Sequence, residues 1–304
     1  MNMSEFWRPV GKRPLIKKLG TIDIYGAEAT PFVFNGRLYR FESTNVAHYA
    51  NDTGVNYFRI VDSETRQIYP PFAHGCEYGC AYVEGGMVYV AGTFPGGGEK
   101  IKLFWSSDFN HWEEKVILDL PGWGLYNTSI CKARDRYFMA IEINAPQDRT
   151  GAFFTINFAT STNLVDWEIM DKECVYAKDR YTACPSIRFY DGYFYMVYLE
   201  ALPIHRYVPY VARSRDLMHW EVGIYSPFLM IDDEDKIFKY PGITPLQLKN
   251  LEETADISNS DVDFCEWQGK TYILYLWGNQ LGLHCMAEAE YDGSEREMLE
   301  AFFN

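Results

Sequence analysis

Three seven-residue segments of the chain repeat one pattern, in which a Ser is followed two residues later by Asp or Asn and four residues after that by Trp. They occupy residues 106–112, 161–167 and 214–220, and each has an apolar residue at its fourth position. The Trp residues are 55 (112 to 167) and 53 (167 to 220) positions apart. A repeat of this period indicates an array of similar structural units.

A second repeat, Gly-x-x-Tyr, supports this period. Four copies begin at Gly36, Gly86, Gly192 and Gly269, and a fifth has Arg134 in place of Gly and ends at Tyr137. Each Gly marks a turn, and each Tyr opens a run rich in β-formers. Units of about four strands that recur every ~50 residues are typical of β-propeller blades. We therefore predict an all-β fold, a five-bladed β-propeller. A helical solenoid would require long helical periodicity, which this chain lacks.

The predicted propeller forms one domain over residues 1–304. Its blades cover roughly 20–70, 71–120, 121–172, 173–225 and 255–293. An insertion at 226–258, which contains the acidic run 232–235, forms either a solvated loop or a wall over the central funnel. Ser294 and Glu297 have the spacing of a capping box, so we expect a short C-terminal helix.

The charge and composition exclude several classes of partner. The formal net charge is −14, and phosphate backbones require a basic face, so we expect no nucleic-acid partner. No apolar run approaches the ~20 residues of a membrane span. The N-terminus lacks an apolar signal core, and the seven Cys include no Cys-x-x-Cys pair. We expect a cytoplasmic protein with reduced thiols and without a metal or cofactor.

The chemistry of a propeller concentrates where its innermost strands meet at the axis. We call the Tyr of each Gly-x-x-Tyr copy the ladder Tyr, and the strand that it opens the ladder strand. The positions eleven residues before each ladder Tyr are Glu28, Tyr78, Tyr126, Cys184 and Asp261. Two of them are carboxylates, and they lie in the first and last blades, which become neighbours when the ring closes. Unpaired buried carboxylates are costly, so a functional role is favoured over core filling. The alternative for each is a turn cap or an ion pair between blades.

Two further carboxylates accompany this pair. Glu77 precedes Tyr78, and Asp263 follows Asp261 by two residues, which places both Asp side chains on one face of a regular strand. Glycoside hydrolysis needs two opposed carboxylates, one to protonate the leaving oxygen and one to act as base or nucleophile. We predict that Glu28, Glu77, Asp261 and Asp263 supply these groups.

The loops after the ladder strands should form the rim of the funnel. They cover residues 42–45, 93–98, 142–144, 200–206 and 277–280. The predicted substrate-binding residues are Tyr78, Tyr126, Asn127, Glu200, Trp277, Gln280 and His284. Trp277 would provide a stacking platform for a sugar, although a core Trp fits the same pattern. His284 is a proton donor, a metal ligand or a structural side chain.

Together these features resemble the five-bladed propeller glycoside hydrolases, which include family 43 arabinofuranosidases and β-xylosidases, invertase-like family 32, and anhydrogalactosidase family 117. The resemblance covers residues 26–293 and rests on the two repeats and on the run 183–187. That run is similar to the Glu-Cys-Pro motif that carries the acid in the invertase-like group, but Ala183 replaces its Glu. Residues 126–128 replace the usual third-blade Asp, and Glu28 matches the family's base or nucleophile.

The resemblance implies a glycosidase that acts from the end of a small sugar or oligosaccharide. Two alternatives remain open. A glycoside phosphorylase would need a cationic cluster at the rim, for which Arg40, Arg59, Arg180 and Arg206 are candidates. A sugar-binding propeller without catalysis would explain the replaced family carboxylates.

Overall fold

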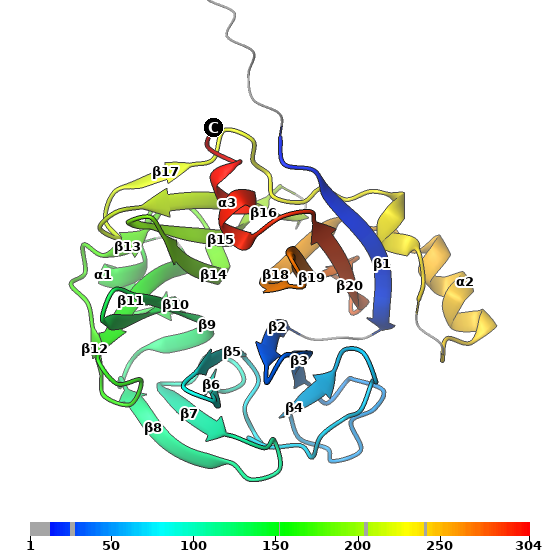
Figure 1. Cartoon of the computed structure of the whole chain (residues 1–304), viewed down its shortest axis with the longest axis horizontal. Helices are drawn as coiled ribbons and strands as arrows, with labels where there is room; N and C mark the ends of the chain where they lie inside the picture. The colour runs from blue at the N-terminus through cyan, green and yellow to red at the C-terminus, as the bar shows by residue number, and fades with distance from the viewer. Residues whose placement is uncertain (1–12, 25–27, 152, 204–205, 240–241) are drawn as a thin grey trace, which may run out of the picture.

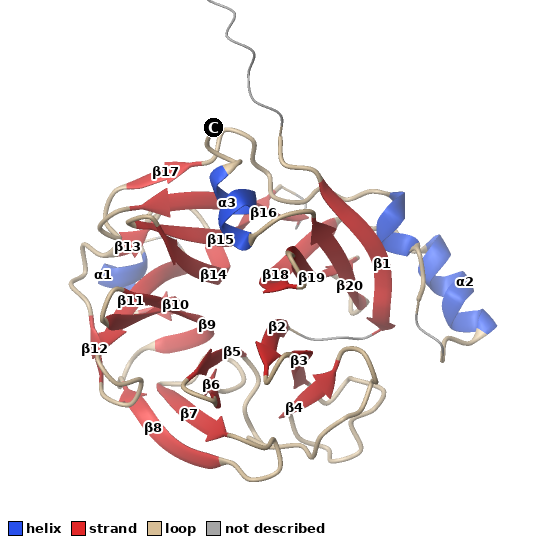
Figure 2. Cartoon of the chain, viewed as in Figure 1, coloured by secondary structure: helices blue, strands red, loops and turns tan. Residues whose placement is uncertain are grey.

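Five antiparallel sheets stand around a central axis in the computed structural model (Figures 1 and 2). The structure describes all residues except 1–12, 25–27, 152, 204–205 and 240–241. Blade 1 contains β2 (Ala29–Phe34), β3 (Arg37–Thr44) and β4 (Tyr57–Asp62), and blade 2 contains β5 (Gly79–Glu84), β6 (Met87–Gly92), β7 (Lys100–Ser106) and β8 (Glu113–Asp119). Blade 3 contains β9 (Gly124–Ala133), β10 (Arg136–Ala145), β11 (Thr155–Ser161), β12 (Trp167–Ile169) and β13 (Val175–Tyr176). Blade 4 contains β14 (Thr182–Tyr190), β15 (Tyr193–Leu202), β16 (Arg206–Ser214) and β17 (Trp220–Val222). This architecture confirms the predicted five-bladed β-propeller.

The last blade is closed by the N-terminal strand. It contains β18 (Ser258–Trp267), β19 (Lys270–Gly278) and β20 (His284–Tyr291), and β1 (Ile16–Ile24) pairs with β20 from Ile16↔Tyr291 to Ile24↔Cys285. The two ends of the chain therefore share one sheet, a pairing outside the blade boundaries drawn from the sequence. This pairing holds the ring closed, because opening the ring would break the hydrogen bonds between β1 and β20.

The Ser/Asp/Trp segments are the turns that lead to the outermost strands. In the first of them, Ser106 Oγ accepts the backbone N–H of Phe109, and Asp108 Oδ1 accepts that of His111. Trp112 Nε1 donates to Phe109 O. The apolar residue adopts a positive φ in all three copies, at Phe109, Leu164 and Leu217, and each is buried. The motif recurs because these polar contacts hold an apolar residue in a left-handed conformation under the blade.

The Gly-x-x-Tyr copies are tight hairpins. In blade 1, Asn35 and Gly36 both have positive φ and join the pair Phe34↔Arg37, as a two-residue hairpin of type I′ requires. Blade 3 lacks the Gly, and Arg134 itself takes a φ of 59°. The ladder Tyr then points into the layer between blades.

The apolar core lies between the blades as separate layers. The largest layer joins blades 4 and 5 and includes Trp277, Phe264 and Phe302. Further layers join the other neighbouring blades. The smallest lies between blades 5 and 1, where the buried apolar residues within the described part of the chain are Ala29, Leu274, Leu276 and Met286. The interface that closes the ring therefore has the smallest apolar layer of the five.

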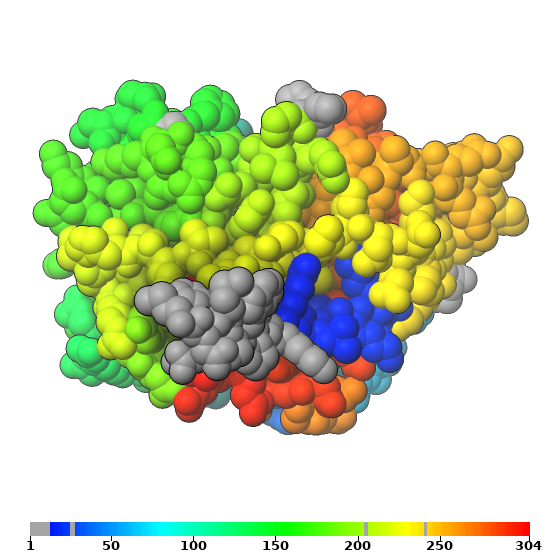
Figure 3. All heavy atoms as spheres, turned by 90° about the horizontal axis from the view of Figure 1, so that it is seen from above, coloured from blue at the N-terminus to red at the C-terminus, as the bar shows by residue number. Residues whose placement is uncertain are grey.

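The insertion packs against the closing blade. It contains the 3₁₀ helix η2 (Asp233–Lys236) and α2 (Pro245–Glu253), and Thr21 of β1 exchanges backbone hydrogen bonds with Ile237 and Lys239. Figure 3 shows its yellow and orange atoms beside the blue atoms of β1. None of its described residues lines the axial cavity. The insertion thus covers the free edge of β1.

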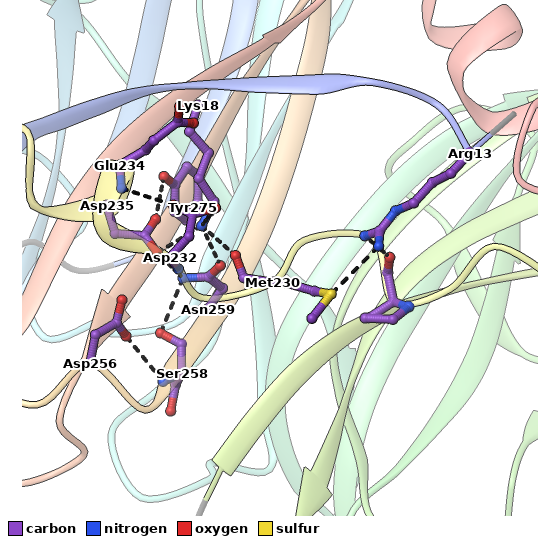
Figure 4. A network of polar contacts seen from close by, with 11 residues as sticks. Arg13, Lys18, Met230, Asp232, Glu234, Asp235, Asp256, Ser258, Asn259 and Tyr275 are labelled. Carbon is purple, nitrogen blue, oxygen red and sulfur yellow. Dashed lines mark hydrogen bonds and ion pairs between the residues drawn. The ribbon is translucent and has the colours of Figure 1, made fainter.

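Buried polar groups fix this contact (Figure 4). Lys18 Nζ lies 2.7 Å from Asp235 Oδ2, and Tyr275 OH donates to Asp235 Oδ1 at 2.7 Å. Asn259 contacts both Lys18 and Asp235. Burial and the neighbouring Asp235 raise the pKa of Asp256 to about 8. The acidic run thus anchors β1 to β18 and β19 of the last blade.

The C-terminal helix is confirmed. α3 (Glu295–Glu300) begins at Ser294, which accepts the Glu297 N–H, and the Glu297 side chain accepts the Ser294 N–H in return. Its Met298 and Leu299 are buried in the layer between blades 4 and 5.

Candidate functional site

The starts of the innermost strands enclose a small polar cavity at the axis. Its lining includes Glu28, Asn127, Cys184, Asp261 and Asp263, from four different blades. Its volume is about 30 Å³, comparable with one or two water molecules. Glu28 and Asp261, which were predicted from their equal offset to the ladder Tyr, therefore line the same cavity. A substrate larger than water must bind in the mouth above them.

An irregularity at the same position in three successive blades shapes this cavity. The strand ladders are interrupted beside Asn127 in blade 3, at Cys184 in blade 4 and at Asp261 in blade 5. Cys184 has a φ of 47° and Asp261 a φ of 50°. Bulges redirect side chains and cluster near active sites, and left-handed non-glycine residues carry strain. Here the bulges direct both side chains toward the axis.

The bulge also separates the two Asp residues that a regular strand would place on one face. Asp263 Oδ1 accepts hydrogen bonds from Ser186 Oγ at 2.5 Å and Arg188 Nη2 at 2.8 Å. Arg188 also pairs with Glu295 of α3. Asp261 and Asp263 both line the cavity, but Asp263 is also held in an ion pair that joins blades 4 and 5. Of the two, we therefore treat Asp261 as the candidate for the reaction.

A buried carboxylate to which the sequence analysis gave no role forms hydrogen bonds with two residues that line the cavity. Glu142, at the end of β10, is 4% exposed, and its Oε2 accepts Asn127 Nδ2 and the Cys184 N–H, both at 2.9 Å. Burial, reinforced by the charge of Asp261 and opposed by these hydrogen bonds, raises its pKa to about 7. Its location in a rim segment was its only signal in the sequence. It reaches Asn127 at the point where the pairing of β9 with β10 is irregular.

The environment of Glu28 favours its protonated form. Burial raises its pKa well above the usual value, and the charges of Asp261, Glu142 and Glu77 raise it further. A hydrogen bond with Asn127 acts in the opposite direction. Burial likewise raises the pKa of Glu77. Glu77 lies outside the cavity lining and acts on Glu28 through its charge.

The Cys184 thiol occupies the axial position of blade 4. Burial raises its pKa well above the ordinary value, with further contributions from Asp261, Glu142 and Glu28. It hydrogen-bonds to Asp261 and accepts from Asn127 Nδ2 at 3.4 Å. A neutral thiol at this position orients the Asp261 carboxylate without adding charge.

A continuous arc of partly exposed aromatic rings lies beside these groups. Ring centroids are 5.4 Å apart for Tyr78–Tyr126, 4.9 Å for Tyr126–Phe154, 5.3 Å for Phe154–Tyr181 and 5.6 Å for Tyr181–Tyr207. After burial, the charges of Cys184, Glu142 and Asp261 contribute to the raised pKa values of Tyr181 and Tyr207, so this end of the arc lies close to the carboxylates. Tyr78 and Tyr126 were predicted, whereas the other three were not.

Gly97 allows this arc to form. A Cβ on Gly97 would lie 2.5 Å from the Tyr126 ring, so the loop reaches the ring only because that atom is missing. Tyr126 OH also donates to Gly96 O at 3.1 Å. The glycine run is thus a close-packed turn.

The remaining predicted residues lie elsewhere. Trp277 is 1% exposed, and its Nε1 donates to Thr21 Oγ1 at 2.6 Å. It has no open face for a sugar, which corrects the stacking prediction. Glu200 pairs with Arg180 at 2.8 Å and lies outside the axial lining. Gln280 donates to Ser258 Oγ at 3.2 Å, and His284 opens β20 beside Gly278.

No group of three His, Cys, Asp or Glu residues within the described part of the chain has the arrangement of a metal site. Nor does any helix among those residues have the length and apolar character of a membrane span. None of the seven cysteines, all of which lie in the described part of the chain, forms a disulfide.

Comparisons with known proteins identify the fold. No family model and no curated sequence matches this chain. Three similar solved structures are the catalytic domain of a GH62 α-L-arabinofuranosidase from Coprinopsis cinerea, a xylan β-1,4-xylosidase from Bacillus halodurans C-125 and a GH32 β-fructofuranosidase from Bombyx mori. Their TM-scores are 0.60, 0.58 and 0.56, at 10%, 14% and 13% identity. The chain has the fold of the five-bladed propeller glycoside hydrolases.

The matches span nearly the whole of this chain. They cover 94%, 91% and 90% of it, and 99%, 54% and 61% of the respective partners. The expected resemblance is therefore confirmed at the level of the fold, with a divergent sequence.

Proposed function

We propose that this protein is a glycoside hydrolase whose axial carboxylates cleave a small sugar from the end of its substrate. The observation that carries the proposal is the meeting of Glu28 and Asp261 in one cavity within a set of interacting acidic groups. Two carboxyl groups with different protonation states are what glycoside cleavage requires. The shared fold with glycosidases supports this assignment.

The electrostatics support a role for Glu28 different from that of base or nucleophile, which the family resemblance implies. Glu28 keeps its proton more strongly than an ordinary Glu, so we assign it as the general acid. Asp261 lines the same cavity as Glu28, and after burial its charge contributes to the raised pKa of Glu28, so we assign it as the base or nucleophile. Glu142 is a positioning residue that holds Asn127 and the Cys184 backbone.

The aromatic arc supplies the binding surface above the carboxylates. Tyr78, Tyr126 and Tyr181 present ring area to the apolar faces of a sugar. Nothing in the small axial cavity would admit a whole sugar ring, so stacking on the arc would place the scissile bond over Glu28 and Asp261. The proposed substrate is a small glycoside or oligosaccharide, and the proposed location is cytoplasmic.

The arginines argue against a phosphorylase at this site. Of the four candidates, none lines the axial cavity. Arg180 pairs with Glu200, and Arg40 and Arg59 line a separate cavity that shares no residue with the axial one. Phosphate would therefore find no described cation among the residues around Asp261.

A substrate screen tests the proposal. Aryl furanosides, aryl pyranosides and short oligosaccharides would be incubated with the protein, with and without inorganic phosphate, and the released sugars identified. We expect hydrolysis without phosphate, a loss of at least ~100-fold in Asp261→Asn and normal rates in Asp166→Asn, a solvent-exposed control. Turnover that needs phosphate would indicate a phosphorylase, and saturable binding without turnover would indicate a sugar-binding propeller.

A further inference from the structure

A second cavity lies at the interface that closes the ring. Its volume is about 270 Å³, and residues of blade 1, of β1, β19 and β20, and of the insertion line it. It shares no lining residue with the axial cavity. This is also the interface with the smallest apolar layer, so polar groups hold much of it together.

Two buried guanidinium groups face this cavity. The side chains of Arg40 and Arg59 are 12% and 5% exposed. Each uses its Nε to donate to one carboxylate oxygen of Glu42. Burial acts to raise the pKa of Glu42, but the two cations outweigh it and lower that pKa to about 2. Glu42 is therefore ionised at neutral pH, and the three side chains together carry one net positive charge.

Most of the donors on these two arginines remain available. A guanidinium has five N–H donors, and Glu42 takes only the Nε of each. Arg59 Nη2 is 3.7 Å from Asp23 Oδ2, an ion pair too long for a hydrogen bond. Among the described residues, no acceptor binds the Nη groups of Arg40. Guanidinium donors that are fixed by Glu42 and line a cavity are suited to a ligand rich in oxygen.

Other groups add to this character. Arg66 lines the same cavity from a turn in which its φ is 62°, and the described part of the chain offers its side chain no partner. Ser63 also lines it, and its buried Oγ has no hydrogen-bond partner among the described residues. With Lys239, the cavity lining contains four basic side chains and two carboxylates, those of Asp23 and Glu288. Glu288 is occupied by Lys239 at 2.9 Å.

We propose that this cavity binds a small oxyanion, held by Arg40, Arg59 and Arg66 with Ser63 as a further donor. The shared chemistry is a compact group with several anionic oxygens, either a phosphate or the carboxylate of an acidic sugar. The cavity is large enough for that group with a small attached moiety. Because blades 1 and 5 both contribute residues, the bound anion would stabilise ring closure. The site is independent of glycoside cleavage.

Binding measurements on the full-length protein test the proposal. Inorganic phosphate and D-glucuronate would be titrated separately by calorimetry, with chloride adjusted to keep the ionic strength constant. We expect saturable binding of at least one anion, and the anion that binds identifies the source. Asp261→Asn should bind the anion normally, because it alters only the axial cavity.

Two matched arginine variants decide where the anion binds. Arg66 and Arg134 are both exposed arginines at positive φ, but only Arg66 lines this cavity. We expect Arg66→Ala to weaken binding by at least tenfold and Arg134→Ala to change it by less than twofold. The proposal would be overturned by an absence of saturable binding for both anions, or by equal effects of the two variants. Arg66 makes no described side-chain contact, so its removal leaves the fold in place.

Discussion

The raised pKa of Glu142 predicts a variant that is more stable than the natural protein at high pH. In Glu142→Gln, the amide oxygen still accepts from Asn127 and the Cys184 N–H, but no buried charge forms. The folded pKa is about 7 against an ordinary value of 4.5. A difference of about 2.5 in pKa corresponds to about 3 kcal/mol of free energy of unfolding, at 1.36 kcal/mol for each unit.

The sign follows from proton binding. The folded protein holds the Glu142 proton more tightly than the unfolded chain, so this contribution to stability is complete below about pH 4.5. It disappears as the pH rises toward 7, because the buried carboxylate must then ionise. Glu142→Gln should match the natural protein at pH 4.5 and exceed it by about 3 kcal/mol at pH 8, or roughly 6 °C in Tm.

Urea unfolding at the two pH values measures this difference. Glu42→Gln is the matched control, since Glu42 is a buried carboxylate with its pKa lowered to about 2 by Arg40 and Arg59. Its replacement should lower the stability at pH 8, because two buried guanidiniums lose their counter-ion. An advantage of Glu142→Gln that is the same at pH 4.5 and 8, or that is missing at pH 8, would refute the reasoning.

Three further predictions follow from the packing and the site. Trp277→Ala should lower the free energy of unfolding by about 3–5 kcal/mol in denaturant titrations, and a loss below 1 kcal/mol would contradict its place in the core. Lys18→Met should destabilise the closing blade because it leaves Asp235 buried without its cation; hydrogen exchange should then quicken in β1, and unchanged exchange would refute the anchoring role. Tyr181→Ala should raise KM at least ~10-fold and change kcat little, whereas an effect on kcat alone would argue against the stacking surface.

The fold was predictable because each blade repeats its own local signals. Hairpin glycines and Ser/Asp/Trp turns act through backbone conformation within a few residues. The counted offset brought Glu28 and Asp261 together because the inner strands start at equivalent places. The closure by β1 carried no local signal, since it pairs residues from opposite ends of the chain.

The candidate site was only partly predictable, because its shape depends on departures from regular strands. A regular strand would align Asp261 with Asp263, and the bulge at Asp261 separates them. Glu142 meets Asn127 where the pairing of β9 with β10 is irregular, which the sequence does not show. The sequence places Trp277 at the end of a strand, which predicts a residue of the rim. In the structure, the insertion and β1 bury that end of the strand.

The central claim is that Glu28 donates the proton that releases the leaving group and that Asp261 acts on the other side of the bond. Once a substrate is identified, kcat/KM should be measured for a series of glycosides whose leaving groups range from alkyl alcohols to nitrophenols, in the natural protein and in Glu28→Gln. We expect Glu28→Gln to lose far more activity on alkyl leaving groups than on nitrophenols, which need little protonation. An equal loss across the whole series would contradict the assignment and return Glu28 to the role of base or nucleophile.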